Sequence, residues 1–283
     1  MTVGIYTNLH KDGDLSVTTA LLNELRARKV DYVLDPALKG KVKGSFFDLE
    51  KSPDCDVMIT VGGDGTILRI AKYCAVYGVP IAGLNLGYVG FLAEEDPENI
   101  REFVDKIIKG DYKLESRSLL NADVNGQSFL ALNEVILTRE ITSRMIETDV
   151  FVNDEFVDRF FCDGFIISTP TGSTAYSLSA GGAILSPTVS AFILTSINSH
   201  SLHSRPIVVS EKDEITLTAT CDASLVIDGN VDAEVKKGEM VKVRKYDKEV
   251  SFVRFRGHSF YEKLLTKLNK WSFTDGRNKL NND

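Results

Sequence analysis

The sequence predicts an α/β, Rossmann-like N-terminal domain with a parallel sheet, followed by a β-rich C-terminal domain. Up to residue 112, short apolar runs alternate with segments of helical period, which is the order of elements in a parallel sheet. Beyond that point, strand-like segments follow one another at short intervals. A final segment with helical period is expected to pack back on the first domain. We therefore assign residues 1–112 and 258–283 to the α/β domain and 113–257 to the β-rich domain.

Strands and helices are expected to alternate in the α/β domain. Asp14 or Ser16 can cap the first helix, and Gly110 stops the last one. Residues 46–53 are left open as a linker or a helix. The expected strands lie at 3–6, 31–34, 57–61 and 79–84, and the expected helices run to residue 29, to about residue 77 and over 96–108.

The β-rich domain is predicted from a succession of short strand patterns. Asn125-Gly126 is a strong signal for a tight turn that joins the first two strands as a hairpin. The helical tail covers residues 260–268. The expected strands lie at 118–124, 127–137, 148–152, 156–161, 164–168, 207–209, 214–219, 224–227, 240–245 and 250–255.

Composition indicates a cytoplasmic globular protein. Of the 283 residues, 43% are hydrophobic and 26% are charged, and the net charge of −7 argues against general nucleic-acid binding. No apolar run is long enough for a membrane span, and residues 1–6 read as a strand rather than as a signal peptide. The four cysteines are scattered without a Cys-x-x-Cys pair, which indicates buried thiols in a reducing compartment.

A glycine-rich turn, Gly62-Gly63-Asp64-Gly65-Thr66, follows the apolar run at 57–61. Glycines at a strand-to-helix turn let backbone N–H groups approach an anion, and the start of a helix favours negative charge. A carboxylate in such a cradle makes sense if Asp64 accepts a proton from an attacking hydroxyl or faces a metal ion. The alternative is a plain hairpin turn, which Asp-Gly also favours. The helical spacing that follows and the next strand at 79–84 favour the phosphate-binding loop.

Two further polar segments are candidate ligand contacts. In the segment 84–91, Asn85, Gly87 and Gly90 come just after a strand, where parallel sheets bind ligands, although an ordinary surface loop has the same residues. Asn133-Glu134 interrupts an apolar strand pattern, which fits either a sheet bulge or a pair of residues in contact with a ligand.

The segment 163–177 carries the densest group of hydroxyl side chains. An apolar strand is followed by six hydroxyl residues within ten, a density that suits phosphate and ribose recognition, although capped turns also use Ser and Thr. His200-Ser-Leu-His203 has metal-like spacing but lacks a helix and a nearby Glu, so no residue is assigned as a metal ligand. The sequence contains no Gly-x-Gly-x-x-Gly, Walker A or Gly-x-Ser-x-Gly motif.

Together these segments resemble the NAD kinase family. The resemblance lies in Gly62-Gly63-Asp64-Gly65-Thr66, in Asn133-Glu134 and in Asp163-Gly-Phe-Ile-Ile-Ser-Thr-Pro-Thr-Gly-Ser-Thr-Ala-Tyr-Ser177, in that order. Segments 200–206 and 227–229 also match. The glycine–aspartate block alone is shared with lipid kinases and phosphofructokinases, whereas the hydroxyl-rich block is specific.

The resemblance implies a reaction and roles for single residues. ATP would phosphorylate the 2′-hydroxyl of the adenosine ribose of NAD, giving NADP and ADP, with Asp64 as general base. Tyr176 would stack on the dinucleotide, and Asp163 would contact a base or amide group. The implied phosphate loop is Gly62, Gly63, Gly65 and Thr66. The implied NAD-binding residues are Asp64, Gly65, Phe91, Asn133, Glu134, Asp163, Thr171, Thr174, Ala175, Tyr176, Ser177 and Asp228.

The resemblance also implies cofactors and partners. A divalent metal, magnesium or manganese, would be carried by the ATP phosphates, because the chain has no Walker lysine. Arg69, one helical turn beyond the glycine turn, either assists or lies on a solvated helix face. A homodimer or homotetramer is expected, in which a neighbouring subunit completes the NAD pocket. Residues 197–199 depart from the pattern of many family members, which have a proline just before the histidine.

Two other functions share some of these features. A lipid kinase would carry the Asp64 loop but would need an apolar groove or a basic membrane-facing patch, and an acidic chain offers no polybasic segment. A nucleotide sensor would bind NAD or NADP without needing the Asp64 carboxylate.

Overall fold

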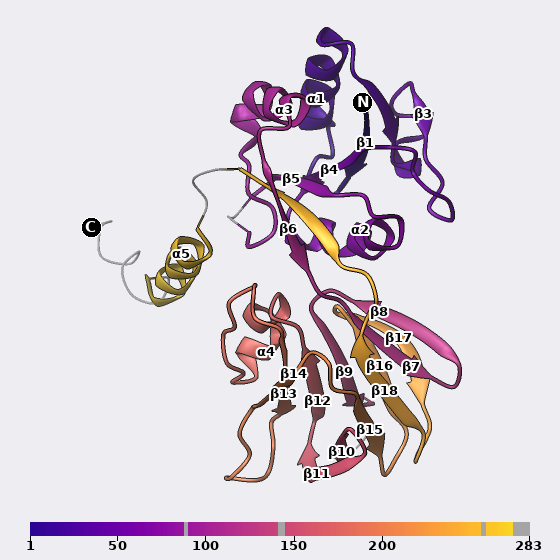
Figure 1. Cartoon of the computed structure of the whole chain (residues 1–283), viewed down its shortest axis with the longest axis vertical. Coiled ribbons are helices and arrows are strands. Elements are labelled where there is room, and N and C mark those ends of the chain that lie inside the picture. The colour runs from indigo at the N-terminus through magenta and orange to yellow at the C-terminus, as the bar shows by residue number, and fades with distance from the viewer. Residues whose placement is uncertain (88–89, 141–144, 256–258, 274–283) are drawn as a thin grey trace, which may run out of the picture. The chain divides into compact units, whose positions relative to one another are not determined.

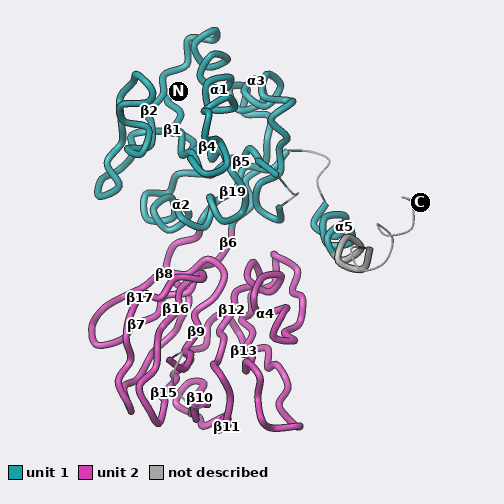
Figure 2. The backbone as a smooth tube through the Cα atoms, turned by 180° about the vertical axis from the view of Figure 1, so that it is seen from behind, with its two compact units in different colours: residues 1–116, 250–283 teal, residues 117–249 magenta. Residues whose placement is uncertain are grey.

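The computed structural model describes residues 1–87, 90–140, 145–255 and 259–273, with side chains up to residue 267. These residues form two compact units, Met1–Ser116 with Val250–Asp283 and Arg117–Glu249 (Figure 2). Within the described residues, no helix has both the length and the apolar character that a membrane span requires.

Unit 1 is built on a seven-stranded sheet with the order β3-β2-β1-β4-β5-β19-β6. The pairs β3–β2, β2–β1, β1–β4, β4–β5 and β5–β19 are parallel. All residues of β4 are buried, which places this strand in the middle of the sheet and its C-terminal end beside β1 and β5. The strands are β1 (Thr2–Thr7), β2 (Asp31–Leu34), β3 (Ser45–Phe46), β4 (Val57–Gly62), β5 (Ile81–Asn85), β6 (Lys113–Arg117) and β19 (Val250–Arg254).

Helices cover both faces of this sheet (Figure 1). Apolar residues of α1 and α3 share one core cluster with β1, β4 and β5, whereas α2 packs against β4, β5 and β19. The helices are α1 (Ser16–Ala27), α2 (Asp64–Tyr77), α3 (Ile100–Lys109) and α5 (Phe260–Phe273), with short 3-10 turns η1 (Pro36–Leu38) and η2 (Pro97–Asn99). The alternation of strand and helix that the sequence predicts is confirmed.

The cap of α1 differs from the prediction in part. Asp14 does accept the Ser16 N–H at 3.1 Å, but the buried Asp12 carboxylate accepts the N–H groups of Val17 and Thr18 and the Thr18 hydroxyl. Asp12 therefore satisfies most of the free donors at this helix start, a role that side-chain oxygens play at N-termini.

The strand at 250–255 was expected in the β-rich domain, but it belongs to the sheet of unit 1 as β19. Phe252 pairs in parallel with Ile81 of β5, and Val250, Phe252 and Val253 are buried. Burial on both faces is typical of a parallel sheet covered by helices. A strand pattern shows apolar character but not its partner, so the last strand could not be assigned to a sheet from its own residues.

Unit 2 is a sandwich of two six-stranded sheets, β11-β10-β15-β18-β7-β8 and β14-β13-β12-β9-β16-β17. Residues of both sheets fill one core, for example Val150 and Leu217 from the first and Phe165 and Leu225 from the second. The strands are β7 (Leu120–Val124), β8 (Gln127–Ala131), β9 (Glu134–Arg139), β10 (Ile146–Val152), β11 (Glu155–Cys162), β12 (Gly164–Ser168), β13 (Ala191–Ile197), β14 (Ile207–Ser210), β15 (Ile215–Ala219), β16 (Ala223–Ile227), β17 (Asn230–Val235) and β18 (Met240–Lys245), with η3 (Gly172–Thr174) and α4 (Tyr176–Ser179).

The predicted hairpin and the predicted long strand have different outcomes. Asn125 and Gly126 join β7 and β8 with φ values of 49° and 76°, which confirms the tight turn. The single strand expected at 127–137 is instead two strands, β8 and β9, with a break at Leu132 and Asn133. The break exists because the Asp228 carboxylate accepts the N–H groups of Leu132, Asn133 and Glu134 at 2.9, 2.7 and 3.2 Å.

The C-terminal helix α5 belongs to unit 1, as the sequence predicts. The Lys263 side chain is buried in an ion pair with Glu94, and the Phe260 ring lies 5.9 Å from the Phe91 ring. The helix is therefore anchored on the segment that follows β5.

Candidate functional site

The glycine turn of unit 1 lies at the C-terminal end of the central strand. β4 ends at Gly62, α2 begins at Asp64, and β4 and β5 are parallel, so the hairpin alternative is excluded. The buried Thr66 hydroxyl accepts the Gly63 N–H at 3.3 Å. A Cβ on Gly62 would lie 2.8 Å from the Cβ of Thr66, so a side chain does not fit at residue 62. Thr66 thus shapes the turn from its inner side.

The Asp64 carboxylate faces a second segment, which follows β5. Oδ2 accepts the Phe91 N–H at 2.8 Å, and Oδ1 accepts the N–H groups of Leu92 and Ala93 at 3.0 and 3.1 Å. A Cβ on Gly90 would lie 2.6 Å from Cγ of Asp64, so the close approach depends on glycine there. The Asp64 side chain remains 28% exposed. A carboxylate has about four acceptor positions, and one on Oδ2 is left for a further donor.

Sequence reasoning overlooked Lys11, which lies over the glycine turn. Its Nζ donates to the Leu86 carbonyl oxygen at 3.0 Å and lies 2.7 Å from the position of a Cβ on Gly63. Within the described residues, no carboxylate forms an ion pair with Lys11. Because Lys11 follows β1, the strand beside β4, its place at the carboxyl edge of the parallel sheet was a usable signal.

The other predicted residues come together in unit 2. The start of β9, with Asn133 and Glu134, meets the hydroxyl-rich turn because the Thr169 N–H donates to the Asn133 carbonyl oxygen at 2.9 Å. Gly172 approaches the same residue so closely that a Cβ there would lie 2.5 Å from the Asn133 carbonyl carbon. Asp228 binds the other side of this segment through its three N–H contacts. Of the predicted NAD-binding residues, Asp64, Gly65 and Phe91 lie in unit 1, as does the whole predicted phosphate loop, and the others lie in unit 2.

The hydroxyl side chains of the turn fall into two groups. Thr169, Ser173 and Ser177 are buried and bind their own unit: the Thr169 hydroxyl donates to the Leu132 carbonyl at 2.6 Å and the Ser173 hydroxyl to that of Pro170 at 2.6 Å. Ser177 lies 3.4 Å from the Thr195 hydroxyl. The predicted residues with accessible surface are Thr171, Thr174, Ala175 and Tyr176.

Glu134 is buried, and its Oε2 has no hydrogen-bond partner among the described residues. Burial, with a smaller contribution from the Asp228 charge, raises the pKa of Glu134 from 4.5 to about 8. Glu134 is therefore protonated at neutral pH in the protein without ligand. A buried carboxyl group that has a raised pKa and an oxygen without a hydrogen-bond partner is typical of functional sites.

The raised pKa of Glu134 predicts that stability falls with pH. Between pH 4.5 and about 8 the folded protein retains a proton that the unfolded chain has released, so the free energy of unfolding decreases as pH rises. Within this range, Glu134 lowers the free energy of unfolding by up to about 1.4 kcal/mol for each pH unit. In Glu134→Gln this contribution is absent, so the variant should be more stable than the wild type at pH 9. Urea unfolding of both proteins from pH 5 to 9 measures the difference, and parallel pH profiles would contradict the assignment.

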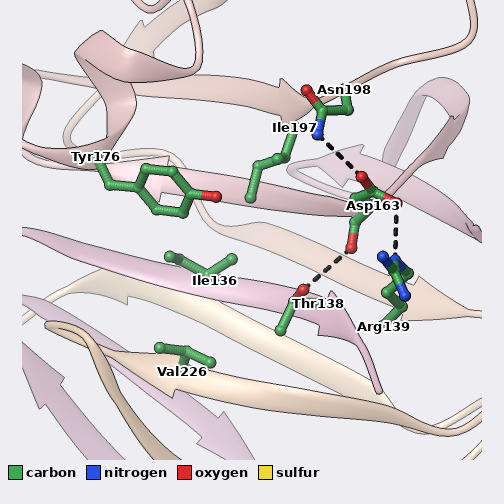
Figure 3. A pocket seen from close by; sticks show the side chains of 8 residues that line it. All are labelled: Ile136, Thr138, Arg139, Asp163, Tyr176, Ile197, Asn198 and Val226. Carbon is green, nitrogen blue, oxygen red and sulfur yellow. Dashed lines mark hydrogen bonds and ion pairs between the residues drawn. The ribbon is translucent and has the colours of Figure 1, made fainter. Parts of the chain in front are cut away.

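A pocket of about 380 Å³ lies on the outer face of one sheet of unit 2 (Figure 3). Tyr176 lies at one end, and Asp163 lies at the other. Asp163 accepts from Arg139 at 2.7 Å and from Asn198 at 2.9 Å, and the Asn198 bond, followed by that from Arg139, lowers the pKa of Asp163. The floor between the two ends is apolar and consists of Ile136, Ile197 and Val226. The shape and polarity of this pocket suit a ligand that has a flat apolar ring with a polar group at its edge.

Comparison with known proteins was made for the whole chain. Residues 3–112 match the model of the ATP-NAD kinase N-terminal domain and residues 132–255 that of the ATP-NAD kinase C-terminal domain. The NAD kinase of Thermoanaerobacter sp. (strain X514) is 38% identical over 278 residues, which cover 94% of this chain and 98% of the relative.

Two solved structures resemble the fold. An NAD kinase from Archaeoglobus fulgidus, in complex with ATP, has a TM-score of 0.78 and 28% identity over 95% of this chain and 99% of its own. Yeast NADH kinase complexed with NADH has a TM-score of 0.86 at 22% identity, over 98% of this chain and 88% of its own, a likeness of fold.

The α/β unit with its glycine turn and the β-sandwich with its hydroxyl-rich turn are thus those of a nucleotide-dependent kinase. The identity to the Thermoanaerobacter enzyme extends over nearly the whole of both chains. The chain belongs to the NAD kinase family.

Proposed function

We propose that this chain transfers the γ-phosphoryl group of ATP to the 2′-hydroxyl of the adenosine ribose of NAD, giving NADP and ADP. Family membership and the ATP complex of the Archaeoglobus relative support the reaction class. The observation that carries the site assignment is the Asp64 carboxylate, part-exposed at a glycine turn beside the Lys11 ammonium.

Asp64 acts as general base in this proposal. The ribose oxygen forms a bond to the γ-phosphorus while the bond from that phosphorus to the β,γ-bridging oxygen breaks, and ADP leaves with the electron pair. The hydroxyl proton passes to Asp64 Oδ2, which accepts one N–H bond in the structure and has room for another donor. The N–H bonds to Phe91, Leu92 and Ala93 fix the carboxylate in place before the substrate arrives.

The phosphates of ATP bind the glycine turn in this proposal. Gly62, Gly63 and Gly65 permit close approach to the N-terminus of α2, where backbone N–H groups favour an anion. Lys11 supplies a positive charge at the same edge of the sheet. Arg69 is exposed on α2, and we give it no role.

Replacing Lys11 with alanine is expected to weaken ATP binding. One charge-assisted contact to phosphate is worth about 1.5–3 kcal/mol, so the KM for ATP should rise about tenfold or more, while the KM for NAD stays within about twofold. Initial rates at varied ATP and NAD measure both constants. Lys11→Arg should retain part of the affinity, and Lys39→Ala, at an exposed lysine of the same unit, is the charge-matched control. An unchanged KM for ATP in Lys11→Ala would remove Lys11 from the phosphate site.

A divalent metal belongs to the nucleotide in this proposal and arrives on the ATP phosphates. The described groups at the turn are backbone N–H donors, the Lys11 ammonium and the Asp64 carboxylate, which suit phosphate oxygens and a hydroxyl proton. When bound, the metal neutralises phosphate charge and helps to align the γ-phosphate. Magnesium or manganese fits this role.

The NAD site draws on unit 2. Asn133 and Glu134 hold the adenosine, Asp228 fixes their backbone, and the accessible residues Thr171, Thr174 and Ala175 line the site together with Tyr176. Tyr176 stacks on the dinucleotide, and Asp163 contacts a base or amide group; both line the pocket of Figure 3. The enzyme functions in the cytoplasm as a homodimer or homotetramer, in which a neighbouring subunit completes the NAD pocket.

The proposal is tested by incubating the purified protein with ATP, magnesium and NAD, and by reading NADP with an NADP-specific dehydrogenase. NADP should accumulate only when all three are present. Folded protein that forms no NADP would overturn the proposal. Lipid phosphorylation in parallel assays, or NAD binding without turnover, would then point to a lipid kinase or a sensor.

A further inference from the structure

The C-terminal helix docks on the segment that holds Asp64. Phe260 of α5 lies against Phe91, and Lys263 of α5 forms a buried ion pair with Glu94. Arg254 binds the same Glu94 at 2.9 Å and donates to the Leu92 carbonyl oxygen at 2.8 Å. The segment that provides three N–H groups to Asp64 is thus also held by α5 and β19.

One turn beyond Lys263, the helix directs Lys267 at Asp64. The Lys267 Nζ lies 3.7 Å from Asp64 Oδ2 and 4.2 Å from the centre of the Phe91 ring, and its side chain is 29% exposed. A lysine that is partly removed from water, beside both a carboxylate and an aromatic face, is held in place by two attractions. The sequence of α5 contains no motif from which this contact could be predicted.

We propose that Lys267 is a positioning residue for the phosphoryl transfer. Its ammonium lies 3.7 Å from Asp64 Oδ2 and therefore limits the rotation of the carboxylate that receives the ribose proton in the proposed reaction. Its position over Phe91 couples the same cation to the ring that we place beside the bound dinucleotide. The inference rests on the proposed role of Asp64 as general base.

Among the described residues, α5, α2 and the segment after β5 contribute the groups that contact Asp64, and Lys11 lies at the adjacent Gly63. α5 contributes Lys267, α2 contributes the positive end of its own helix dipole, and the segment after β5 contributes backbone N–H groups. Glu94, Glu115, Arg254 and Lys263 pair among themselves. Among the described side-chain cations, Lys267 is therefore the one that forms an ion pair with Asp64.

The test is the steady-state kinetics of NADP formation by Lys267→Met, Lys267→Gln and Lys267→Arg. In the first two variants, kcat should fall about fivefold or more, because the Asp64 carboxylate loses the cation that holds it in place. Lys267→Arg should restore most of the wild-type kcat. The KM for ATP should stay within about twofold, because a cation acting on Asp64 does not bind the phosphates. Lys109→Met, at an exposed lysine of α3, should match the wild type.

A double-variant comparison separates this role from a purely structural one. If Lys267 acts through Asp64, Lys267→Met should cost little further activity in an Asp64→Asn background. A full additional loss there, or a wild-type kcat in two folded Lys267 variants, would overturn the inference. Thermal unfolding of each variant identifies any that fail to fold. Absence of NADP from the wild type, by contrast, would overturn the proposed function itself.

Discussion

Asp64→Asn is expected to form NADP between about 10²- and 10⁴-fold more slowly than the wild type, because a positioned general base contributes that much to a proton transfer. The loss should fall on kcat. An amide retains an acceptor for the N–H groups of Leu92 and Ala93, but its NH₂ group faces the Phe91 N–H, where two donors meet. Initial rates with saturating ATP and NAD measure the effect.

Binding measurements keep this result interpretable. The affinities of Asp64→Asn for ATP and for NAD should stay within a few-fold of wild type if the site is still assembled. Lys109→Met, at an exposed residue of the same unit, is the control for purification and assay. Equal rates in Asp64→Asn and wild type would leave a kinase whose base is another group.

Gly172→Ala is expected to damage both the stability of unit 2 and the NAD site. The new Cβ would lie 2.5 Å from the carbonyl carbon and 2.7 Å from the Cα of Asn133, and backbone atoms cannot turn aside as a side chain can. Overpacking of this kind costs about 1–3 kcal/mol of unfolding free energy. Because the hydroxyl-rich turn must move away from Asn133, the KM for NAD should rise about tenfold or more while the KM for ATP changes little.

A second glycine provides the matched control. A Cβ on Gly13 would meet only the Leu9 carbonyl oxygen at 3.4 Å, an ordinary contact, and so Gly13→Ala should keep the wild-type stability and kinetics. Urea unfolding and steady-state kinetics on both variants compare them directly. Wild-type behaviour of Gly172→Ala would show that the two segments do not need their close approach.

The fold was predictable where one residue pattern determines one element. The apolar run of β4, the glycine turn and the helical spacing of α2 define a parallel crossover without further information. Strand partners were less accessible, since pairing depends on residues far away in the chain. The strand at 250–255 was therefore assigned to the β-rich domain, whereas β19 belongs to the sheet of unit 1, and β13 and β17 were not distinguished from loops.

The candidate site was predictable where its residues stand in motifs. Asp64 and the Asn133-Glu134 pair are conspicuous because polar residues interrupt an apolar pattern. Lys11 and Lys267 could not be identified from the sequence, because exposed loops and helices commonly contain lysine. Only the fold shows that the ammonium of Lys11 lies at Gly63 and that of Lys267 at Asp64. The break before β9 was likewise hidden, because it depends on a carboxylate that lies 94 residues further along the chain.

Because β19 belongs to the sheet of unit 1, the two units can complete their folding during synthesis only in a fixed order. While unit 2 is being synthesised, the β5 edge has no β19 beside it, and Asp64 has no Lys267. Unit 2 is a continuous stretch of chain and can complete its own fold as soon as it has emerged. The unit whose synthesis begins first is therefore completed after unit 2, and its open β5 edge is exposed to other nascent chains until β19 has emerged.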